Sequence, residues 1–375
     1  MNDDAWIDHA GSPDDEAERQ ALMATHAAAV EAGRTEAETP TFEQTAPRLG
    51  SFLDESVGVM RARAEGDDKP IPLPHLKSVQ KALNGGLWPG CWVLVGNTGS
   101  GKSQFALQLS WEAAKAGAPV LYVGLELGKV DLTARMLGLA SGRKWSRLYR
   151  GENSHSERST SELEEVAADY GPELAELPWH LELAPPFGWS HEQLAAGVAG
   201  LCARYPAGER GGLPPLVVVD FLQLVTSPEG QPQDSLRERI GRMAYAARSA
   251  AREHGAVVLL VSSTARANYA TLNGQPSSKE DKDRRPTWER PAYLCVGLGK
   301  ESGEVEYAAD GVLALVKEPD PKTNEAGRAA GARPTQSTMH LAVAKQRAGQ
   351  AEWVRGLRFD GGRFFEDGLT RKAIQ

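Results

Sequence analysis

Cysteine is scarce in this sequence. Only three cysteines occur among 375 residues, and Cys91, Cys202 and Cys295 lie far apart without forming a CxxC pair. The eight histidines are similarly scattered, and no HExxH motif occurs. Zinc sites and disulfide frameworks require closer or more regular spacing of these residues. We therefore predict reduced, mostly buried thiols and no structural metal.

Long apolar runs are absent as well. Runs such as 216–219 and 257–261 are far shorter than the roughly 20 residues of a transmembrane helix, so they predict buried strands. The amino-terminal residues, MNDDAWIDHAG, are acidic where a signal or transit peptide would place Lys or Arg before an apolar stretch. The sequence therefore predicts a cytoplasmic protein with no membrane partner.

Basic residues are outnumbered by acidic ones, and the net charge is −8. The acidity lies at the front, because the first 68 residues hold 16 of the 50 acids and 5 of the 42 bases, which leaves about +3 on the remainder. Local clustering, and not the total, decides the field at a groove. The charge therefore permits a nucleic-acid partner without indicating one.

Three regions differ in composition. Residues 1–40 are predicted to form an acidic arm, in which Ser12 and Pro13 resemble the start of a helix. The apolar face of this helix is weak, so the arm could be partly helical or disordered. Residues 41–69 hold a predicted linker helix, whose apolar residues recur at helical intervals. This apolar stripe consists of Leu49, Phe52, Leu53, Val57 and Met60. The main domain is predicted to span residues 70–368.

Helical stretches and short apolar runs alternate in this main domain. Such alternation is typical of an α/β fold with a mainly parallel sheet covered by helices on both faces. Strands are predicted at 92–95, 120–124, 216–219, 256–262, 311–316, 339–344 and 353–359. The last of these are expected to be antiparallel strands near the carboxyl end.

A phosphate-binding loop (P-loop) follows the first predicted strand. The segment GNTGSGKS matches GxxxxGK[ST] and lies between the apolar WVLV and the helical QFALQLSWEAAKAG, a context that a chance Gly-rich turn would lack. Lys102 can reach the β- and γ-phosphates of ATP, and the Ser103 hydroxyl can hold Mg²⁺. The predicted nucleotide-binding residues are Gly96, Asn97, Thr98, Gly99, Ser100, Gly101, Lys102, Ser103 and the following Gln104.

Two acids complete the predicted catalytic site. The apolar run PLVVVD ends in Asp220, which is predicted to hold Mg²⁺ together with Ser103. Glu126 follows the next strand after the P-loop helix and is predicted to orient or deprotonate the attacking water. The ends of parallel strands converge on a ligand at one sheet edge. Taken alone, Asp220 could be a turn former and Glu126 a solvated carboxylate.

Six further segments occur in a fixed order: LNGGLWPG, GLEL with Glu126, VVVDFLQL with Asp220 and Gln223, LRERIGRMAYAARSAAREHGAVVLLVSS, KESGEVEYAADGVLAL and AKQRAGQAEWVRGLRFDGG. Together they resemble the carboxy-terminal motor domain of DnaB-like replicative helicases, within the RecA-like superfamily. The resemblance covers residues 45–366. It implies a RecA-like P-loop core in which Gln223 also belongs to the nucleotide site.

The resemblance further implies an assembly. Such helicases form homo-oligomeric rings, usually hexamers, with ATP at the subunit interfaces and single-stranded DNA in the central channel. It implies that Arg347 is an arginine finger for the neighbouring subunit's nucleotide, with Lys345 as its companion, and that the linker helix packs on that neighbour. From the residues alone, two alternatives stay open. Arg347 and Lys345 could be ordinary surface charges, and the linker helix could pack on its own domain.

The polar segment after Ser262 corresponds to the channel-facing loops of the family. Its predicted DNA contacts, which would bind phosphates without reading sequence, are Arg266, Lys282, Arg284 and Arg285. A solvated loop is the alternative. The stretch SSTAR departs from the family's SQLNR-type stretch, so Ser263 stands where a longer Gln relays the γ-phosphate state to this loop.

Two functions are therefore weighed. The first is an ATP-driven DNA helicase or translocase that acts as a ring on single-stranded DNA. The second is a RecA-like regulatory or scaffold ATPase without unwinding activity, which Ser263 and the acidic arm favour slightly. A recombination-type filament ATPase would use similar chemistry in an open assembly. About 70 residues precede the motor domain where the family has a much larger folded amino-terminal domain, so primase or loader contacts that depend on such a domain are not assumed.

Overall fold

The computed structural model of the chain describes residues 48–155, 157–183, 188–229, 234–265, 268–269, 285–299, 302–318, 337–360 and 362–366. The chain divides into two units, Met1–Ala64 and Glu65–Gln375. The predicted acidic arm at 1–40 lies outside the described residues. Among the described residues, no helix combines the length and the apolar character that crossing a bilayer requires.

The predicted linker helix corresponds to α3 (Leu49–Glu65), which begins in the first unit. None of its residues is buried. Its large apolar side chains are exposed, and they are Leu49, Phe52, Leu53, Val57, Val59 and Met60. In proteins, most of the stability of a helix comes from the packing of its apolar face. The helix therefore presents an exposed apolar surface.

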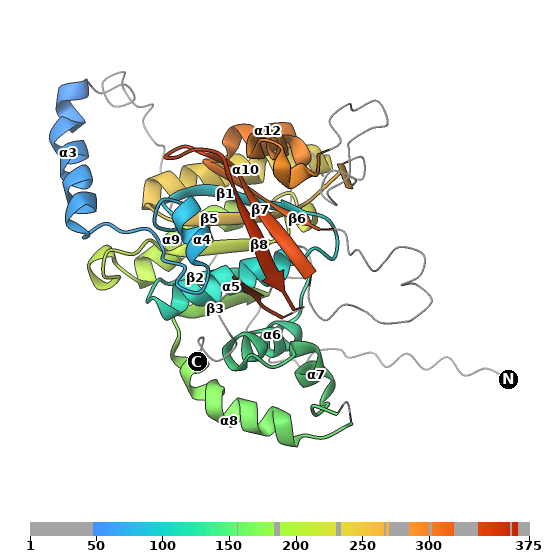
Figure 1. Cartoon of the computed structure of the whole chain (residues 1–375). Coiled ribbons are helices and arrows are strands. Elements are labelled where there is room, and N and C mark those ends of the chain that lie inside the picture. The colour runs from blue at the N-terminus through green and yellow to red at the C-terminus, as the bar shows by residue number, and fades with distance from the viewer. Residues whose placement is uncertain are drawn as a thin grey trace. The chain divides into compact units, whose positions relative to one another are not determined.

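Nine strands of the described residues form one sheet in the second unit, in the order β3-β2-β4-β5-β1-β6-β7-β8-β9. The strands are β1 (Gly90–Gly96), β2 (Val120–Gly124), β3 (Trp179–Leu183), β4 (Leu216–Asp220), β5 (Val257–Ser263), β6 (Gly311–Lys317), β7 (Ser337–Gln346), β8 (Glu352–Phe359) and β9 (Phe364–Phe365). Pairing is parallel from β3 to β6 and antiparallel from β6 to β9 (Figure 1). The predicted α/β fold class is confirmed.

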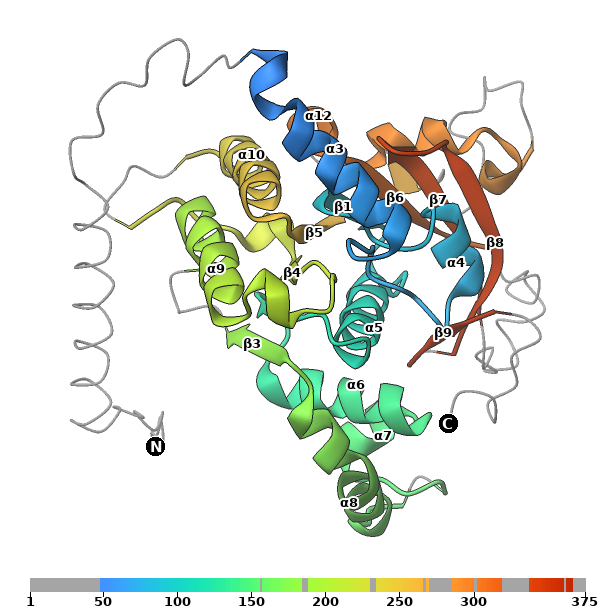
Figure 2. The ribbon, with the colours of Figure 1, turned by 90° about the vertical axis from the view of Figure 1, so that its left-hand side faces the viewer.

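Helices cover both faces of this sheet. The α-helices are α4 (Lys77–Ala82), α5 (Lys102–Lys115), α6 (Lys129–Ser141), α7 (Trp145–Arg150), α8 (Ser161–Glu176), α9 (His191–Arg204), α10 (Leu236–His254) and α12 (Ser302–Ala308). Short 3₁₀ helices are η1 (Ala207–Glu209), η2 (Leu222–Leu224), η4 (Thr287–Glu289) and η5 (Ala292–Leu298). Figure 2 shows α9 and α10 on the side of the sheet away from α5.

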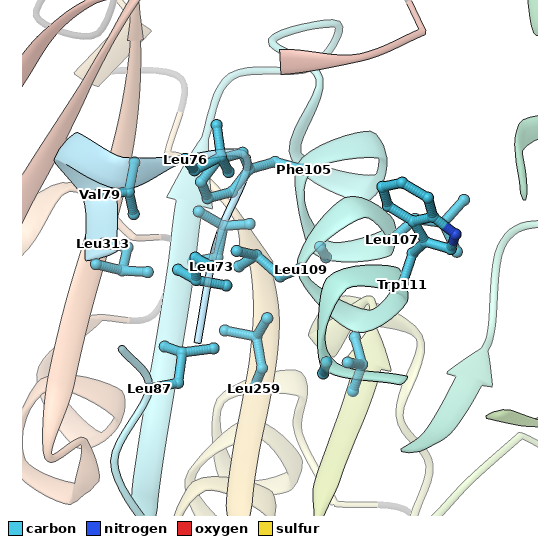
Figure 3. Packing of buried hydrophobic residues seen from close by; sticks show 14 of the residues in the cluster. Leu73, Leu76, Val79, Leu87, Phe105, Leu107, Leu109, Trp111, Leu259 and Leu313 are labelled. Carbon is cyan, nitrogen blue, oxygen red and sulfur yellow. The ribbon is translucent and has the colours of Figure 1, made fainter. Parts of the chain in front are cut away.

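The central strand β1 joins the two apolar layers. Successive side chains of a strand point to opposite faces. Trp92 and Leu94 pack with α5 residues such as Phe105, whereas Val93 and Val95 pack in the layer of α9 and α10. Figure 3 shows the first layer, in which Phe105 and Leu109 of α5 lie with Leu73, Leu76 and Leu259. Burial on both faces explains why this strand is a continuous apolar run.

Local signals set the limits of the helices. Ser235 caps α10 by accepting a hydrogen bond from the Glu238 amide, and the Glu238 side chain accepts one from the Ser235 amide. The helix ends at Gly255, whose φ of +61° is left-handed and suits glycine. These caps thereby set both ends of the helix.

Candidate nucleotide site

The predicted P-loop connects the end of β1 to the start of α5. Gly99 and Gly101 have φ values of +76° and +88°, a left-handed conformation that side chains disfavour. A Cβ atom on Gly96 would lie 2.7 Å from the Ser100 hydroxyl. The loop therefore requires glycine at these positions, and it delivers the chain to the amino terminus of α5. Unpaired amides at such a terminus favour phosphate oxygens.

An aromatic pair backs this loop. The rings of Phe359 in β8 and Phe364 in β9 stack with their centroids 4.3 Å apart. A Cβ atom on Gly101 would lie 3.0 Å from each ring. The two rings, which belong to the antiparallel end of the sheet, therefore limit movement of the start of α5 toward them.

Lys102 is held within the loop. Its ammonium group donates a hydrogen bond of 2.9 Å to the main-chain oxygen of Asn97. Burial lowers the pKa of Lys102, while the charges of Asp220 and Glu126 act in the opposite direction. A half-buried ammonium group next to main-chain amides is a suitable partner for the β- and γ-phosphates.

Asp220 lies at the end of β4 and is almost completely buried. Its Oδ1 accepts a hydrogen bond of 3.1 Å from the Ser103 hydroxyl, and its Oδ2 accepts one of 2.8 Å from the Tyr122 hydroxyl. Burial raises the pKa of Asp220, whereas the hydrogen bonds from Tyr122 and Ser103 lower it. One carboxylate oxygen and one hydroxyl oxygen thus meet beside the P-loop.

These oxygens fit Mg²⁺. In phosphate-transfer sites Mg²⁺ binds one or two protein oxygens and completes its shell with water and substrate phosphates. Ser103 and Asp220 could supply such a pair, because their oxygens already lie within hydrogen-bond distance of each other. The predicted metal residues are therefore brought together by the fold.

Glu126 lies at the same sheet edge. Gly124, the last residue of β2, pairs with Asp220, and the Leu125 amide donates a hydrogen bond of 2.8 Å to the Asp220 main-chain oxygen. The Glu126 side chain is exposed, and its charge influences the pKa values of Lys102 and Asp220. The fold therefore gathers Lys102, Ser103, Asp220 and Glu126 at one edge.

Gln104 is engaged away from the loop. Its amide donates a hydrogen bond of 2.6 Å to the Gly362 main-chain oxygen, and its side-chain oxygen accepts one of 2.8 Å from Arg135. The Arg135 guanidinium lies 3.9 Å from the centroid of the Trp145 ring. The assignment of Gln104 to the nucleotide stays a prediction, and no local pattern in the sequence signals its contact with Arg135. In the structure Gln104 fixes α5 to the carboxyl-terminal segment.

Gln223, in η2, connects the ends of two strands. Its amide donates a hydrogen bond of 2.9 Å to the Ser262 hydroxyl, and its side-chain oxygen accepts one of 3.1 Å from the Ser263 amide. Asp220, only three residues earlier, is the acid at the end of β4. Gln223 therefore links the segment after β4, which follows Asp220, to the end of β5.

Tyr269 contacts the P-loop and was not predicted. Its main-chain oxygen accepts a hydrogen bond of 3.2 Å from the Asn97 side chain, and its hydroxyl lies 3.5 Å from the Thr98 hydroxyl. Tyr269 follows β5 by six residues, so the two contacts join the P-loop to the segment after that strand. No short-range pattern in the sequence signals a contact over 172 positions.

The comparisons with known proteins agree with this geometry. Residues 75–364 match the family model of the DnaB-like helicase C-terminal domain. The chain belongs to this DnaB-like family. The match confirms the resemblance and supports a replicative-helicase type of motor powered by ATP hydrolysis. A search of curated protein sequences found no match.

Two solved structures show the same fold as this DnaB-like chain. The ATPase domain of G40P has 19% sequence identity and a TM-score of 0.61, over 84% of this chain and 98% of that chain. A DnaB-like replicative helicase, described with its interactions with primase, has 17% identity and a TM-score of 0.59, over 86% of this chain and 68% of that chain.

Arg347 and Lys345 lie at the opposite edge of the DnaB-like sheet. Gln346, between them, pairs with Gly311, which pairs with Trp92 near the start of β1. Arg347 forms a 2.9 Å ion pair with Asp310, and Lys345 donates a 2.5 Å hydrogen bond to the Glu306 main-chain oxygen. Neither residue joins the P-loop of its own chain. Any role at a nucleotide would have to be at that of another copy.

The predicted DNA contacts are mostly outside the described residues. Arg266, Lys282 and Arg284 belong to that part of the chain. Arg285 is described and exposed just before η4, and its main-chain oxygen accepts a hydrogen bond of 3.1 Å from Arg290. The assignment of these four residues to DNA stays a prediction.

Proposed function

We propose that this DnaB-like chain is an ATP-driven helicase or translocase that acts on single-stranded DNA as a ring of identical subunits. The observation that carries the proposal is the Ser103–Asp220 pair, 3.1 Å apart, next to a P-loop that encloses Lys102. Family membership supports ATP hydrolysis as the energy source.

Lys102 and the amides of the P-loop would bind and orient the ATP phosphates. Ser103 and Asp220 would hold Mg²⁺, which when bound neutralises phosphate charge and draws electrons from the γ-phosphate. Tyr122 keeps one Asp220 oxygen occupied, so the other oxygen remains oriented toward Ser103. The residues thereby provide a pre-oriented charged site, which is the main contribution of a protein to phosphoryl transfer.

Glu126 would orient and deprotonate the attacking water. It lies at the P-loop edge and is exposed, so water reaches it. Gln223 would report the state of the nucleotide to β5, since its side chain already binds Ser262 and Ser263.

Arg347 and Lys345 would act on the nucleotide of a neighbouring subunit. Their position at the edge opposite their own P-loop supports this role. A finger from the next subunit would place positive charge at the γ-phosphate only in the assembled ring. The resemblance to the family supports a hexamer with ATP at each interface.

Single-stranded DNA would bind in the channel through the segment that holds Arg266, Lys282, Arg284 and Arg285. The contact of Tyr269 with Asn97 and Thr98 supports coupling between this segment and the P-loop. Contacts to phosphates release counterions, so the affinity should fall steeply with salt.

Steady-state ATPase assays of Lys102→Ala and Glu126→Gln, with and without single-stranded DNA, test the proposal. We expect Lys102→Ala to lose nucleotide binding and turnover, and Glu126→Gln to bind nucleotide while losing roughly 10²–10⁴-fold in kcat. Glu253→Gln, an exposed change on α10, is the control that should retain wild-type turnover. Unchanged turnover in Lys102→Ala would refute the site.

A regulatory or scaffold ATPase is the second candidate. Ser263, which offers Gln223 its main-chain amide, favours it because a serine side chain does not reach as far as the family's Gln. Oligonucleotide affinity at several salt concentrations, with electron microscopy in the presence of nucleotide, separates the two. A steep salt dependence and closed rings support the motor, whereas nucleotide-dependent assembly without DNA binding supports the scaffold.

A further inference from the structure

Asp310 connects the start of β1 to the end of β7. Its main-chain amide donates a hydrogen bond of 2.7 Å to the Cys91 oxygen, and its main-chain oxygen accepts one of 3.0 Å from the Arg347 amide. Its Oδ2 accepts a hydrogen bond of 2.9 Å from the Cys91 amide. Its Oδ1 lies 2.9 Å from Nε of Arg347. Four contacts thus hold one acid between two strands.

The ion pair joins a fixed partner to a more accessible one. The Asp310 side chain is only 14% exposed and is held by Cys91, whereas the Arg347 side chain is 45% exposed. Asp310 contacts Nε, the innermost nitrogen of the guanidinium, so the two terminal nitrogens extend further out. Arginine can therefore keep this contact and still donate hydrogen bonds to a second anion.

The surroundings of the pair are basic. Arg252 of α10 lies 3.7 Å from the same Asp310 oxygen. Burial, followed by the charges of Arg347 and Arg248, lowers the pKa of Lys345, whereas the charges of Asp310 and Glu306 raise it. Four bases, Arg347, Arg252, Lys345 and Arg248, thus meet two acids at this edge, which suits an anionic group that arrives from outside the chain.

The same strand serves both edges. β1 has seven buried residues, which span about 20 Å at roughly 3.3 Å each. Its carboxyl end enters the P-loop, and its first residues bind Asp310. A side chain fixed through Asp310 is therefore positioned relative to the subunit's own nucleotide site.

We propose that Asp310 is a positioning residue that holds Arg347 in place for the nucleotide of a neighbouring copy. The inference rests on the proposed function, in which Arg347 acts between subunits. It adds the residue that orients the finger and connects it, through β1, to the P-loop of its own chain.

A double-mutant cycle tests this role. In the full-length chain we expect Arg347→Ala to lose on the order of 10³-fold in kcat. Asp310→Asn keeps an acceptor for the Cys91 amide but removes the charge, and we expect a loss of about 10–100-fold through misplacement of Arg347. Affinity for a fluorescent ATP analogue should change less than about twofold in both. The double variant should lose no more than Arg347→Ala alone, because Asp310 acts only through Arg347.

Asp234→Asn is the matched control. Asp234 is 17% exposed and forms a 3.3 Å ion pair with Arg242 of α10, so the change removes a similar pair elsewhere. The control should keep wild-type kcat. Additive losses in the double variant, or wild-type kcat in Asp310→Asn, would overturn the role of Asp310 while leaving the motor function intact.

Failure of the underlying function gives a different result. Wild-type kcat in Arg347→Ala would remove the trans finger itself, and the inference with it. If Asp310→Asn does not fold, Asp310→Glu keeps the charge and moves it by one methylene group. A lowered kcat with unchanged nucleotide affinity in that variant supports the role, and wild-type kcat overturns it.

Discussion

The Tyr122 hydroxyl donates a 2.8 Å hydrogen bond to Oδ2 of Asp220, whose Oδ1 accepts a hydrogen bond from Ser103. Tyr122 is fully buried in β2, with its ring 5.7 Å from that of Trp179. Burial, followed by the Asp220 charge, raises the pKa of Tyr122, so it remains a neutral donor. Tyr122 thus fixes the orientation of the acid predicted to hold Mg²⁺.

Tyr122→Phe should weaken the use of Mg²⁺. The ring and its packing remain, but Asp220 loses the hydrogen bond that orients it, and such supporting contacts are typically worth about 10–100-fold in metal affinity or activity. We expect the Mg²⁺ concentration for half-maximal ATPase to rise about tenfold. Tyr245→Phe, at an exposed tyrosine of α10, should behave as wild type. An unchanged Mg²⁺ requirement in Tyr122→Phe would contradict the role.

Asp220→Asn should change how stability depends on pH. Burial raises the pKa of Asp220 above 3.8, so without metal the folded state keeps a proton that the unfolded state releases. Stability contributed by this group is therefore present at low pH and falls as the pH rises from 3.8 through the raised pKa. The variant removes this loss and should melt higher than wild type in EDTA at pH 8, with a smaller difference at pH 4.

Melting curves across this pH range provide the measurement, and Asp234→Asn provides the surface control. If the difference in melting temperature between Asp220→Asn and wild type does not change with pH, ionisation of Asp220 does not destabilise the metal-free fold, and the expectation is wrong. Mg²⁺ with nucleotide should stabilise wild type more than the variant, because bound ligand favours the folded state.

Gln108→Leu should destabilise the ATPase unit. The buried Gln108 amide donates hydrogen bonds to the Phe364 main-chain oxygen at 2.9 Å and to Glu112 at 3.2 Å, and its oxygen accepts one of 2.8 Å from the Phe364 amide. Leucine fills the space but leaves these groups unsatisfied, at about 1–3 kcal/mol for each. Thermal unfolding should show a melting temperature lower by several degrees. Gln350→Leu, at an exposed site, is the control, and equal melting temperatures would contradict the expectation.

Leu53→Asp and Met60→Asp should prevent assembly. Both residues lie on the exposed apolar stripe of α3 and are 47% and 61% exposed. If this stripe packs on a neighbouring copy, a buried charge there is strongly unfavourable. Light scattering should show smaller particles than wild type with nucleotide present. Ala62→Asp places the same charge on the other side of α3 and should leave the assembly intact, whereas full-sized assemblies in all three variants would remove the predicted interface.

Much of the sheet could be predicted because its strands are continuous apolar runs. The run 216–219 lies within β4, and 257–261 lies within β5, both buried on two faces. β3 was missed, since WHLEL includes a charged and an ionisable residue and lies at the edge of the sheet. The two-residue β9 is too short to leave any periodic signal.

The site divides in the same way. Lys102 and Ser103 were predictable because their spacing is local, and Asp220 because it ends a continuous apolar strand. The hydrogen-bond partners of the site residues could not be predicted, because these bonds join segments that are far apart in the sequence. Tyr122 is 98 residues from Asp220, and Gln104 is 258 residues from Gly362. Asp310 lies in KESGEVEYAADGVLAL, and nothing local in that segment predicts its contacts with Cys91 and Arg347.

The bonds from Gln104 and Gln108 to Gly362 and Phe364 also bear on how the protein is made. A ribosome completes α5 about 250 residues before it adds the segment that satisfies these buried glutamines. Until then, the buried side chains of Gln104 and Gln108 lack these hydrogen-bond partners. A chain interrupted before Gly362 and Phe364 would therefore carry the entire GNTGSGKS segment while α5 lacked these hydrogen bonds, so we expect its P-loop to be less firmly held.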